Sequence, residues 1–330
     1  MKIQGYLINL DRDSARLTEV QSELKKLSFP FQRIAGVLGT DLDPADRKRM
    51  TSAFCDLFCT PSMIGCAASH LKTWRLFLVN QDIDFALICE DDIRFTDDCQ
   101  ERLHTAMSAL PASFDILYGG CLQCHPTESS WTARLFQKLS FDGVGRKDSV
   151  VLSPDLYIPR IALGLHCYLI SKEGAQKLIA LFDDYIAYHV DVQINASFDK
   201  LNILAIYPPI AYQKFELGDS SNVSSYPILL NKAIQNWNQG GISGPYVMSA
   251  PGGQVLGCVV TNWLVVLCFV ATVLGLFSRR YSQIPNLLIG LLLLLIILPD
   301  VAAGSMKGHW HFPISTIILY SALSGTGLLR

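Results

Sequence analysis

The chain has 330 residues, with 27 Lys and Arg against 29 Asp and Glu, and a net charge of −2. This balance argues against a nucleic-acid-binding surface, and we expect no nucleic-acid partner. The charges are unevenly spread, because residues 255–330 carry only five of them: Arg279, Arg280, Asp300, Lys307 and Arg330. The composition therefore excludes disorder for most of the chain and also excludes a fully soluble protein.

Predicted strands and helices alternate along residues 1–235. Short apolar runs predict strands, and apolar residues three to four positions apart predict helices. In chain order we expect a strand at 3–10, a helix at 14–27 with Ser14 as its N-cap, a strand at 31–37, a helix at 62–80, strands at 85–89, 114–118 and 165–170, a helix at 173–182 and a strand at 203–207. This alternation predicts an α/β layer fold with a largely parallel sheet.

The ten cysteines do not suggest a disulfide framework in a chain of this size. Three lie within apolar runs and are expected to be small core residues: Cys66, Cys89 and Cys167. Cys121 and Cys124 have zinc-knuckle spacing, but only His125 is adjacent and no second pair follows, so loop cysteines are favoured over a metal or redox site. This usage suggests a reducing compartment.

Three apolar segments follow the soluble part. Residues 255–277 carry no charge and are long enough to cross a bilayer, whereas 284–298 is shorter and 312–329 contains polar residues and glycines. A buried core helix is the alternative, but nothing amphipathic flanks the first two segments. We expect two or three membrane helices within 255–330, joined to the soluble domain, residues 1–235, by a glycine-rich linker at 236–254.

Three consecutive carboxylates, Glu90, Asp91 and Asp92, directly follow the apolar strand at 85–89. Ligands of open α/β sheets bind at the carboxyl ends of strands. Clustered carboxylates repel one another unless a cation lies among them, and oxygen ligands suit Mn²⁺ or Mg²⁺. The triplet predicts a cation site for a phosphate-bearing substrate, and a solvated acidic turn is the alternative.

Several motifs occur in an order typical of one family. They are residues 6–12 (YLINLDR) with Arg16, 33–36 (RIAG), 64–70 (IGCAASH), 86–92 (ALICEDD), 164–171 (GLHCYLIS) with Gly174 and Ala175, Val190-Asp191, Pro208-Pro209 and Gln213. Over about residues 2–225 the chain resembles glycosyltransferase family 25, which includes lipooligosaccharide β-galactosyltransferases and collagen galactosyltransferases. The resemblance implies a GT-A fold, a Rossmann-like α/β glycosyltransferase domain, and inverting transfer from a UDP-sugar.

The resemblance also implies roles for the acidic residues. Asp92 is the first choice as a direct metal ligand, and Glu90 and Asp91 either ligate the ion or hold ribose and bridging waters. Asp191 is the expected general base on the acceptor hydroxyl. The alternative for Asp191 is an N-cap of a helix at 192–201. The family often has Pro-Val-Asp where this chain has His189-Val190-Asp191.

The resemblance places the donor beside the end of the first strand, at Asn9, Asp11 and Arg12. Arg12 and Arg16 either face the diphosphate or pair with local carboxylates. His70 either contacts substrate or is a hydrogen-bonded buried histidine.

Together these expectations describe a membrane-attached, Mn²⁺- or Mg²⁺-dependent transferase that moves a hexose, galactose first, from a UDP-sugar to a glycan or glycolipid acceptor. Arg279 and Arg280 alone would place residues 1–254 outside the cell. Because UDP-sugars are cytosolic and the apolar run at 6–8 is too short for a secretory signal, we expect the domain on the cytoplasmic side. The alternatives are an inactive sugar-nucleotide or glycan-binding membrane protein and a metal-dependent phosphotransferase, although no Gly-rich phosphate loop with a Lys is found.

Overall fold

The computed structural model describes residues 2–59, 61–122, 124, 146, 148–183, 185–187, 189–213, 251–255 and 258–261. The chain divides into two compact units, Met1–Leu217 and Gly218–Arg330. In the second unit the described residues form one hairpin of β11 (Pro251–Val255) and β12 (Cys258–Thr261). The candidate site lies entirely in the first unit.

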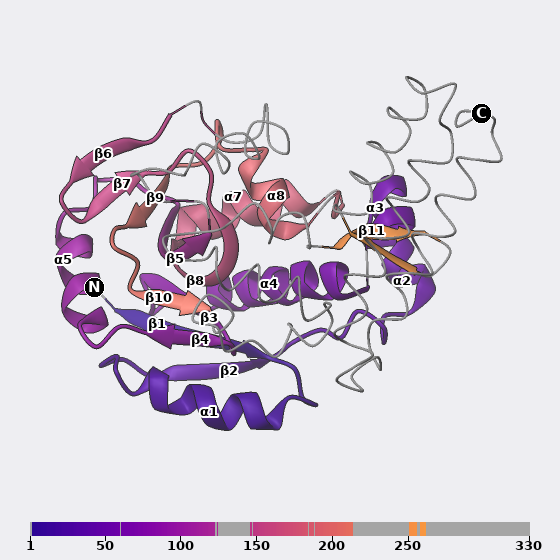
Figure 1. Cartoon of the computed structure of the whole chain (residues 1–330), viewed down its shortest axis with the longest axis horizontal. Helices are drawn as coiled ribbons and strands as arrows, with labels where there is room; N and C mark the ends of the chain where they lie inside the picture. The colour runs from indigo at the N-terminus through magenta and orange to yellow at the C-terminus, as the bar shows by residue number, and fades with distance from the viewer. Residues whose placement is uncertain are drawn as a thin grey trace, which may run out of the picture. The chain divides into compact units, whose positions relative to one another are not determined.

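An eight-stranded mixed sheet forms the centre of the first unit, in the order β2-β1-β3-β8-β5-β9-β7-β6 (Figure 1). Its strands are β1 (Ile3–Asn9), β2 (Phe31–Ala35), β3 (Phe85–Glu90), β5 (Ile116–Leu122), β6 (Val150–Ser153), β7 (Leu156–Ile158), β8 (Leu163–Ser171) and β9 (Ile203–Ile206). β1 pairs in parallel with β2 and β3, and β5 with β9. β8 is antiparallel to both β3 and β5, β7 to both β9 and β6, so the expectation of a largely parallel sheet is corrected at its centre.

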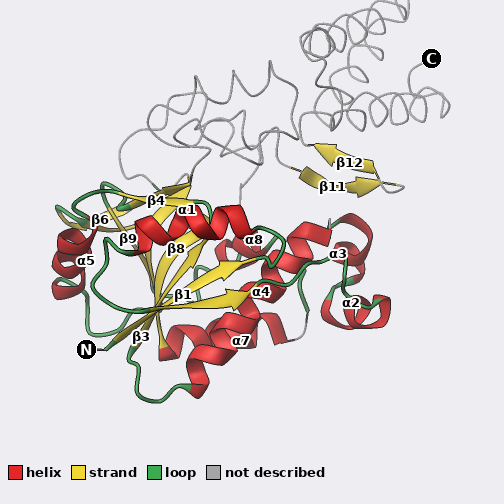
Figure 2. Ribbon diagram, turned by 90° about the horizontal axis from the view of Figure 1, so that it is seen from below, coloured by secondary structure: helices red, strands yellow, loops and turns green. Residues whose placement is uncertain are grey.

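Helices cover both faces of this sheet, as Figure 2 shows for α1 and α7. On one face lie α4 (Pro61–Val79), α7 (Lys172–Asp183) and α8 (Val190–Asn195), and on the other α1 (Ser14–Leu24) and α5 (Cys99–Ser108). Trp74 and Phe77 of α4 share a core with Tyr168 of β8, whereas Leu103 of α5 packs with Leu169 of the same strand. Successive β8 residues thus enter opposite cores, which makes a three-layer, Rossmann-like α/β fold.

A second, two-stranded sheet brings the end of the domain back to the acidic triplet. β4 (Ile93–Phe95) begins directly after Asp92 and pairs antiparallel with β10 (Ala211–Gln213), with Gln213 opposite Ile93. Neither strand was expected from the sequence, because runs of three residues are too short to show alternation. This pairing places Gln213 beside the carboxylates.

The long predicted elements are confirmed, with ends shifted by a few residues. The N-cap of α1 is Asp13 rather than Ser14, which is the first helical residue. The helices α2 (Pro44–Met50), α3 (Ala53–Phe58) and α5 were not expected. Each spans no more than ten residues, so its apolar stripe is short.

Among the residues that the structure describes, no helix combines the length and apolar character needed to span a bilayer. The predicted segments 284–298 and 312–329, and all of 255–277 after residue 261, lie outside those residues. Where the first segment is described, it forms strand: Val255 ends β11, and β12 covers Cys258–Thr261. A helix starting at Val255 is therefore wrong, which agrees with the β-branched run of Val259, Val260 and Thr261. The linker predicted at 236–254 likewise ends in β11.

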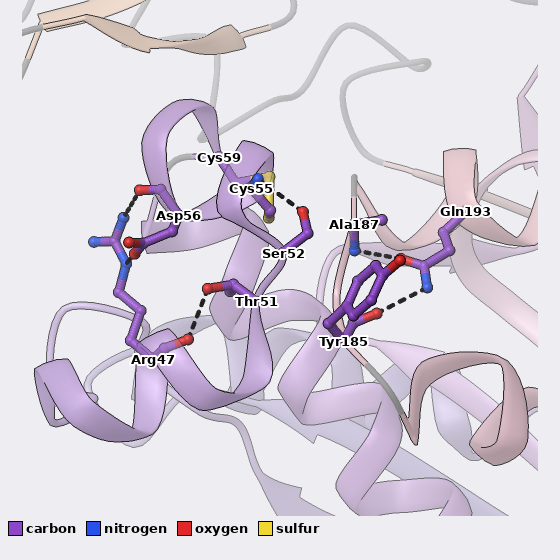
Figure 3. Close-up of a disulfide and its surroundings, with 9 residues drawn as sticks. All are labelled: Arg47, Thr51, Ser52, Cys55, Asp56, Cys59, Tyr185, Ala187 and Gln193. Carbon is purple, nitrogen blue, oxygen red and sulfur yellow. Dashed lines mark hydrogen bonds and ion pairs between the residues drawn. A yellow bond between two sulfur atoms is a disulfide. The ribbon is translucent and has the colours of Figure 1, made fainter.

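Two disulfides correct the expectation that the cysteines are free, and they remove the support that free cysteines gave to a reducing compartment. Cys55 and Cys59 are joined, as are Cys121 and Cys124. Figure 3 shows the first pair, with Cys55 on α3 and Cys59 directly after its last residue. The hydroxyl of Ser52 accepts the Cys55 amide at 3.0 Å and caps the helix. Both pairs are separated by only three or four residues, a local geometry that a count of cysteines does not reveal. Cys89 and Cys167 are buried free thiols, as expected, whereas Cys66, also expected in the core, is a free thiol that is partly exposed.

Candidate active site

The candidate site lies at one edge of the central sheet, where β1 and β3 end. Ile8 near the end of β1 is in register with Glu90 at the end of β3. Because β8 runs the opposite way, its start at Leu163 and Gly164 lies at this same edge. The edge is the one at which α/β sheets bind their ligands.

Asp91 is held in place by two side chains from the N-terminal part of the chain. Asn9 donates from Nδ2 to Asp91 Oδ2 at 2.7 Å, and Arg16 donates from Nη1 to Oδ1 at 2.9 Å. Asn9 is itself fixed, since its Oδ1 accepts from Arg33 Nε at 2.9 Å. Burial raises the pKa of Asp91, and the contacts with Asn9 and Arg16 oppose that shift. Asp91 therefore has a structural role in the triplet, because both of its carboxylate oxygens accept hydrogen bonds.

Asp92 has weaker partners. Arg16 Nη2 lies 3.5 Å from its Oδ2, and Gln213 Nε2 lies 3.5 Å from its Oδ1. Burial, and next the charge of Glu90, raise the pKa of Asp92 to about 7. A cation bound beside such a buried carboxyl would stabilise its ionised form.

Glu90 is oriented by a chain of buried aromatic groups. Its Oε1 lies 3.2 Å from His70 Nε2, while His70 Nδ1 lies 3.0 Å from Tyr168 Oη. Trp74 donates from Nε1 to the same Tyr168 oxygen at 2.7 Å. Burial opposes ionisation of Glu90, but the His70 hydrogen bond and nearby histidines outweigh it, so the pKa of Glu90 is lowered. His70 is thus a hydrogen-bonded buried histidine that contacts a predicted ligand.

These residues fit a hard divalent cation. Glu90 Oε2 and Asp92 Oδ1 both face the side-chain amide of Gln213, at 3.4 and 3.5 Å. The two carboxylate oxygens therefore lie on either side of the Gln213 amide nitrogen, and carboxylate oxygens held near one another in this way are ligands of the kind that Mn²⁺ and Mg²⁺ prefer.

Asp191 lies at the start of α8, whose N-cap is His189, so it is not the N-cap of a helix at 192–201. Its Oδ1 is 2.5 Å from His189 Nδ1 and accepts the Val192 amide at 2.7 Å, and its Oδ2 accepts the Gly164 amide at 2.9 Å. Burial alone would raise the pKa of Asp191, but His189 and these amides lower it. Asp191 is a firmly ionised carboxylate that orients His189.

Asp191 and the triplet belong to one electrostatic environment. Burial raises the pKa of the Cys66 thiol, and the charges of Glu90, Asp191 and Asp92 add to that shift. The charges of Asp191 and Glu90 likewise both act to raise the pKa of His189. Asp191 and the acidic triplet, which were expected from separate segments, are therefore brought to one place.

Two expected donor-binding residues lie apart from the carboxylates. Asp11 is exposed and accepts from Arg33 Nη2 at 2.5 Å. Arg12 Nε is 3.9 Å from Asp13, and its side chain is 64% exposed. Of the two arginines that were expected either to face a diphosphate or to pair with carboxylates, Arg16 pairs with the triplet and Arg12 only with its neighbour.

Several site residues were not predicted from the sequence: Arg33, Cys66, Tyr168, His189 and Gln213. Four of them lie inside the quoted motifs, and His189 stands two residues before Asp191. Their roles depend on contacts between distant segments, such as Tyr168 with Trp74 and Gln213 with Glu90. Their positions within motifs indicated a role at the site, but a motif does not show which of its residues contact one another.

Two glycosyltransferases are among the solved structures that resemble this chain. A galactosyltransferase LgtC in complex with donor and acceptor sugar analogues is 11% identical, with a TM-score of 0.34 over 61% of this chain and 72% of that one. A glycosyltransferase involved in glycosylation of the major capsid of PBCV-1 is 7% identical, with a TM-score of 0.32 over 65% of this chain and 82% of that one.

The comparisons with sequences identify the family. Procollagen galactosyltransferase 1 of Danio rerio is 24% identical over 78% of this chain and 40% of the relative, and inactive glycosyltransferase 25 family member 3 of Mus musculus is 23% identical over 59% and 32%. The chain spans less than half the length of these relatives. The profile described as glycosyltransferase family 25 (LPS biosynthesis protein) matches residues 2–194. Since that match covers more than half of its residues, the chain belongs to glycosyltransferase family 25.

Proposed function

We propose that this protein is a glycosyltransferase with a GT-A type domain that transfers a hexose, galactose first, from a UDP-sugar to a glycan acceptor with inversion. The observation that carries the proposal is that Glu90 and Asp92 both face the Gln213 amide at the end of β3, with the His189–Asp191 pair in the same electrostatic environment. A cation position and a proton acceptor are the two elements that such a transfer needs.

On the donor side, Glu90 and Asp92 would hold Mn²⁺ or Mg²⁺. The ion, when bound, supplies positive charge to the departing diphosphate. Asp91 keeps the triplet in position through Asn9 and Arg16. Arg16, at 23% side-chain exposure, also adds a fixed positive charge beside the carboxylates.

On the acceptor side, the His189–Asp191 pair takes the proton. As the acceptor oxygen forms its bond to the sugar C1, the C1–O bond to UDP breaks and UDP leaves with the electron pair. The hydroxyl proton moves to His189 Nε2, which has no hydrogen-bond partner among the described residues, while Asp191 holds Nδ1. Histidine is the more suitable base of the pair, because the bonds to Asp191 lower the pKa of that carboxylate.

We further propose a lipid-linked acceptor, of lipopolysaccharide or lipooligosaccharide type, and a membrane-attached chain with its catalytic domain on the cytoplasmic side. The support is the low charge of residues 255–330 and the cytosolic origin of UDP-sugars. A cysteine introduced near residue 232 in a cysteine-light background should react with an impermeant reagent only after the membrane is opened. Labelling in intact cells would reverse the orientation.

A donor screen of the full chain tests the activity. With Mn²⁺ present, UDP release should occur from one UDP-hexose and rise with a glycan acceptor, and should disappear when the ion is chelated. The mouse relative named as inactive motivates the competing outcome. UDP binding without release from any donor, with or without acceptor, would make this chain a binding protein instead.

A further inference from the structure

Cys66, His70 and Glu90 form a cluster that the proposed transfer does not use as a unit. Cys66 and His70 are one helical turn apart on α4, so both face the end of β3, where Glu90 stands. One potential ligand atom from each residue lies within 4.8 Å of the other two. We propose that Cys66 Sγ, His70 Nε2 and Glu90 Oε1 form a second cation site, of the Zn²⁺ type.

The spacing of these atoms suits a small tetrahedral ion. Zn–S and Zn–N bonds of about 2.3 and 2.0 Å place the ligands of one ion roughly 3–4 Å apart. His70 Nε2 and Glu90 Oε1, at 3.2 Å, are already in that range, and the ligand atoms of the three residues lie within 4.8 Å of one another. Three protein ligands leave the fourth position open, as in zinc sites that keep a water or substrate.

The surroundings of His70 supply the outer contacts that a metal-bound histidine needs. Such a histidine donates its other ring N–H to a fixed acceptor. His70 Nδ1 lies 3.0 Å from Tyr168 Oη, which is fixed by the Trp74 donor at 2.7 Å and keeps a second lone pair. Without a cation Nε2–H donates to Glu90, and with one the proton moves to Nδ1, so the same three side chains serve both states.

The thiol of Cys66 is partly exposed, so an ion can reach its sulfur. Metal binding takes the thiolate form of cysteine, so a bound ion would release the thiol proton.

Glu90 lies between this site and the donor-cation position and offers one carboxylate oxygen to each. Its Oε1 faces His70, whereas its Oε2 faces Gln213 and the Asp92 side. Sulfur and imidazole ligands favour Zn²⁺ over Mn²⁺, while the carboxylate pair favours the harder ions. The inference goes beyond the proposed transfer, because binding here requires neither donor nor acceptor.

The test is metal binding to the full-length protein in excess Mg²⁺, with Zn²⁺ affinity measured by chelator competition and Co²⁺ as the optical probe. We expect a Co²⁺ spectrum with tetrahedral visible bands and a thiolate charge-transfer band in the near ultraviolet. Cys66→Ser should remove the thiolate band. It and His70→Gln should each weaken Zn²⁺ binding more than about 100-fold, beyond the ~10–100-fold typical of outer contacts.

Two controls make the result specific. Cys99→Ser removes a buried thiol of the opposite core and should bind Zn²⁺ as the wild type does. Asp92→Asn removes the donor-cation carboxylate and should keep the thiolate band, which separates this result from failure of the proposed transfer. A wild-type Co²⁺ complex without a thiolate band, or unchanged Zn²⁺ affinity in Cys66→Ser, would overturn the inference.

Discussion

His189 Nδ1 lies 2.5 Å from Asp191 Oδ1, so the imidazole and the carboxylate share a short hydrogen bond at the start of α8. Burial lowers the pKa of His189, but Asp191, and then Glu90, outweigh this effect and raise it above the usual value. The carboxylate stays ionised, so the imidazole is the member of the pair that changes charge as the pH passes through its raised pKa. This is the arrangement of an orienting acid behind a histidine base.

The first prediction is a pH profile that belongs to His189. Because only the neutral imidazole accepts a proton, kcat should rise as the pH increases through its raised pKa. His189→Gln should lower kcat by ~10²–10⁴-fold and lose this dependence. Asp191→Asn should also lower kcat, and should shift the remaining dependence to lower pH because the stabilising charge is gone. The measurement is kcat against pH at saturating donor and acceptor.

The control for this profile is His104→Gln, because His104 is exposed on α5 and faces solvent. It should leave both the rate and the profile as in the wild type. If His189→Gln kept the acid limb and a near-normal kcat, Asp191 would have to act on the acceptor directly.

The second prediction concerns Arg16, whose guanidinium bridges Asp91 and Asp92 at 2.9 and 3.5 Å. Removing one partner of a largely buried ion pair leaves uncompensated charge. Allowing for the partial exposure of Arg16, Arg16→Gln should reduce the free energy of unfolding of this domain by ~2 kcal/mol. Excess Mn²⁺ should restore part of the loss, since the ion replaces the missing charge.

Arg12→Gln is the matched control for Arg16→Gln. The Arg12 side chain is 64% exposed, and its ion pair with Asp13 is long, at 3.9 Å. Its effect should stay within about 0.5 kcal/mol. Denaturant unfolding followed by amide exchange in the central strands measures both variants. An equal, small effect for the two would show that Arg16 does not hold the triplet.

The third prediction separates the cation ligand from the base. Asp92→Asn should nearly abolish UDP release and weaken Mn²⁺-dependent UDP binding, because one of the two proposed carboxylate ligands is lost. His189→Gln should leave Mn²⁺-dependent UDP binding unchanged, since the proposed His189–Asp191 pair acts on the acceptor and not on the donor. Calorimetric titration of UDP with and without Mn²⁺ distinguishes them. Wild-type binding by Asp92→Asn would place the ion elsewhere.

The sequence was most informative where a pattern is long or where charge is concentrated. The apolar stripe of α4 and the carboxylates after β3 could both be predicted, because each depends on neighbours in the chain. The reversed direction of β8 could not, since an apolar run of this kind carries no information on strand direction. Yet that reversal brings the Gly164 amide to Asp191.

The site, too, could be predicted from the sequence only in part. Asp92 and Asp191 were expected there, but the partner that changes the role of Asp191 is His189, a residue read only as a departure from the family pattern. Gln213 reaches Glu90 across 123 positions through a three-residue strand. Contacts of this range depend on the finished fold, not on local preference.

The last prediction concerns His166, which is fully buried in β8 and whose ring nitrogens have no well-formed hydrogen-bond partner among the described residues. Burial lowers its pKa to about 4, and Glu90 and the backbone of Ala211 oppose this only in part. Because the folded-state pKa lies below the unfolded value, the neutral ring is compatible with the fold at neutral pH. As the pH falls from about 6.5 to 4, the unfolded chain takes up a proton that the folded domain does not.

The wild-type domain should therefore lose stability on acidification by about 1.4 kcal/mol per pH unit across this window, and by about 3 kcal/mol in total from this group. His166→Phe keeps a flat ring beside Gly120 and cannot be protonated. It should lose less stability between pH 6.5 and 4 than the wild type by that amount, although its stability at pH 7 depends on how the ring packs. Amide exchange of β8, measured at several pH values, follows this domain alone. Parallel pH dependences for the two proteins would show that His166 is protonated in the folded state and that its burial does not suppress its charge.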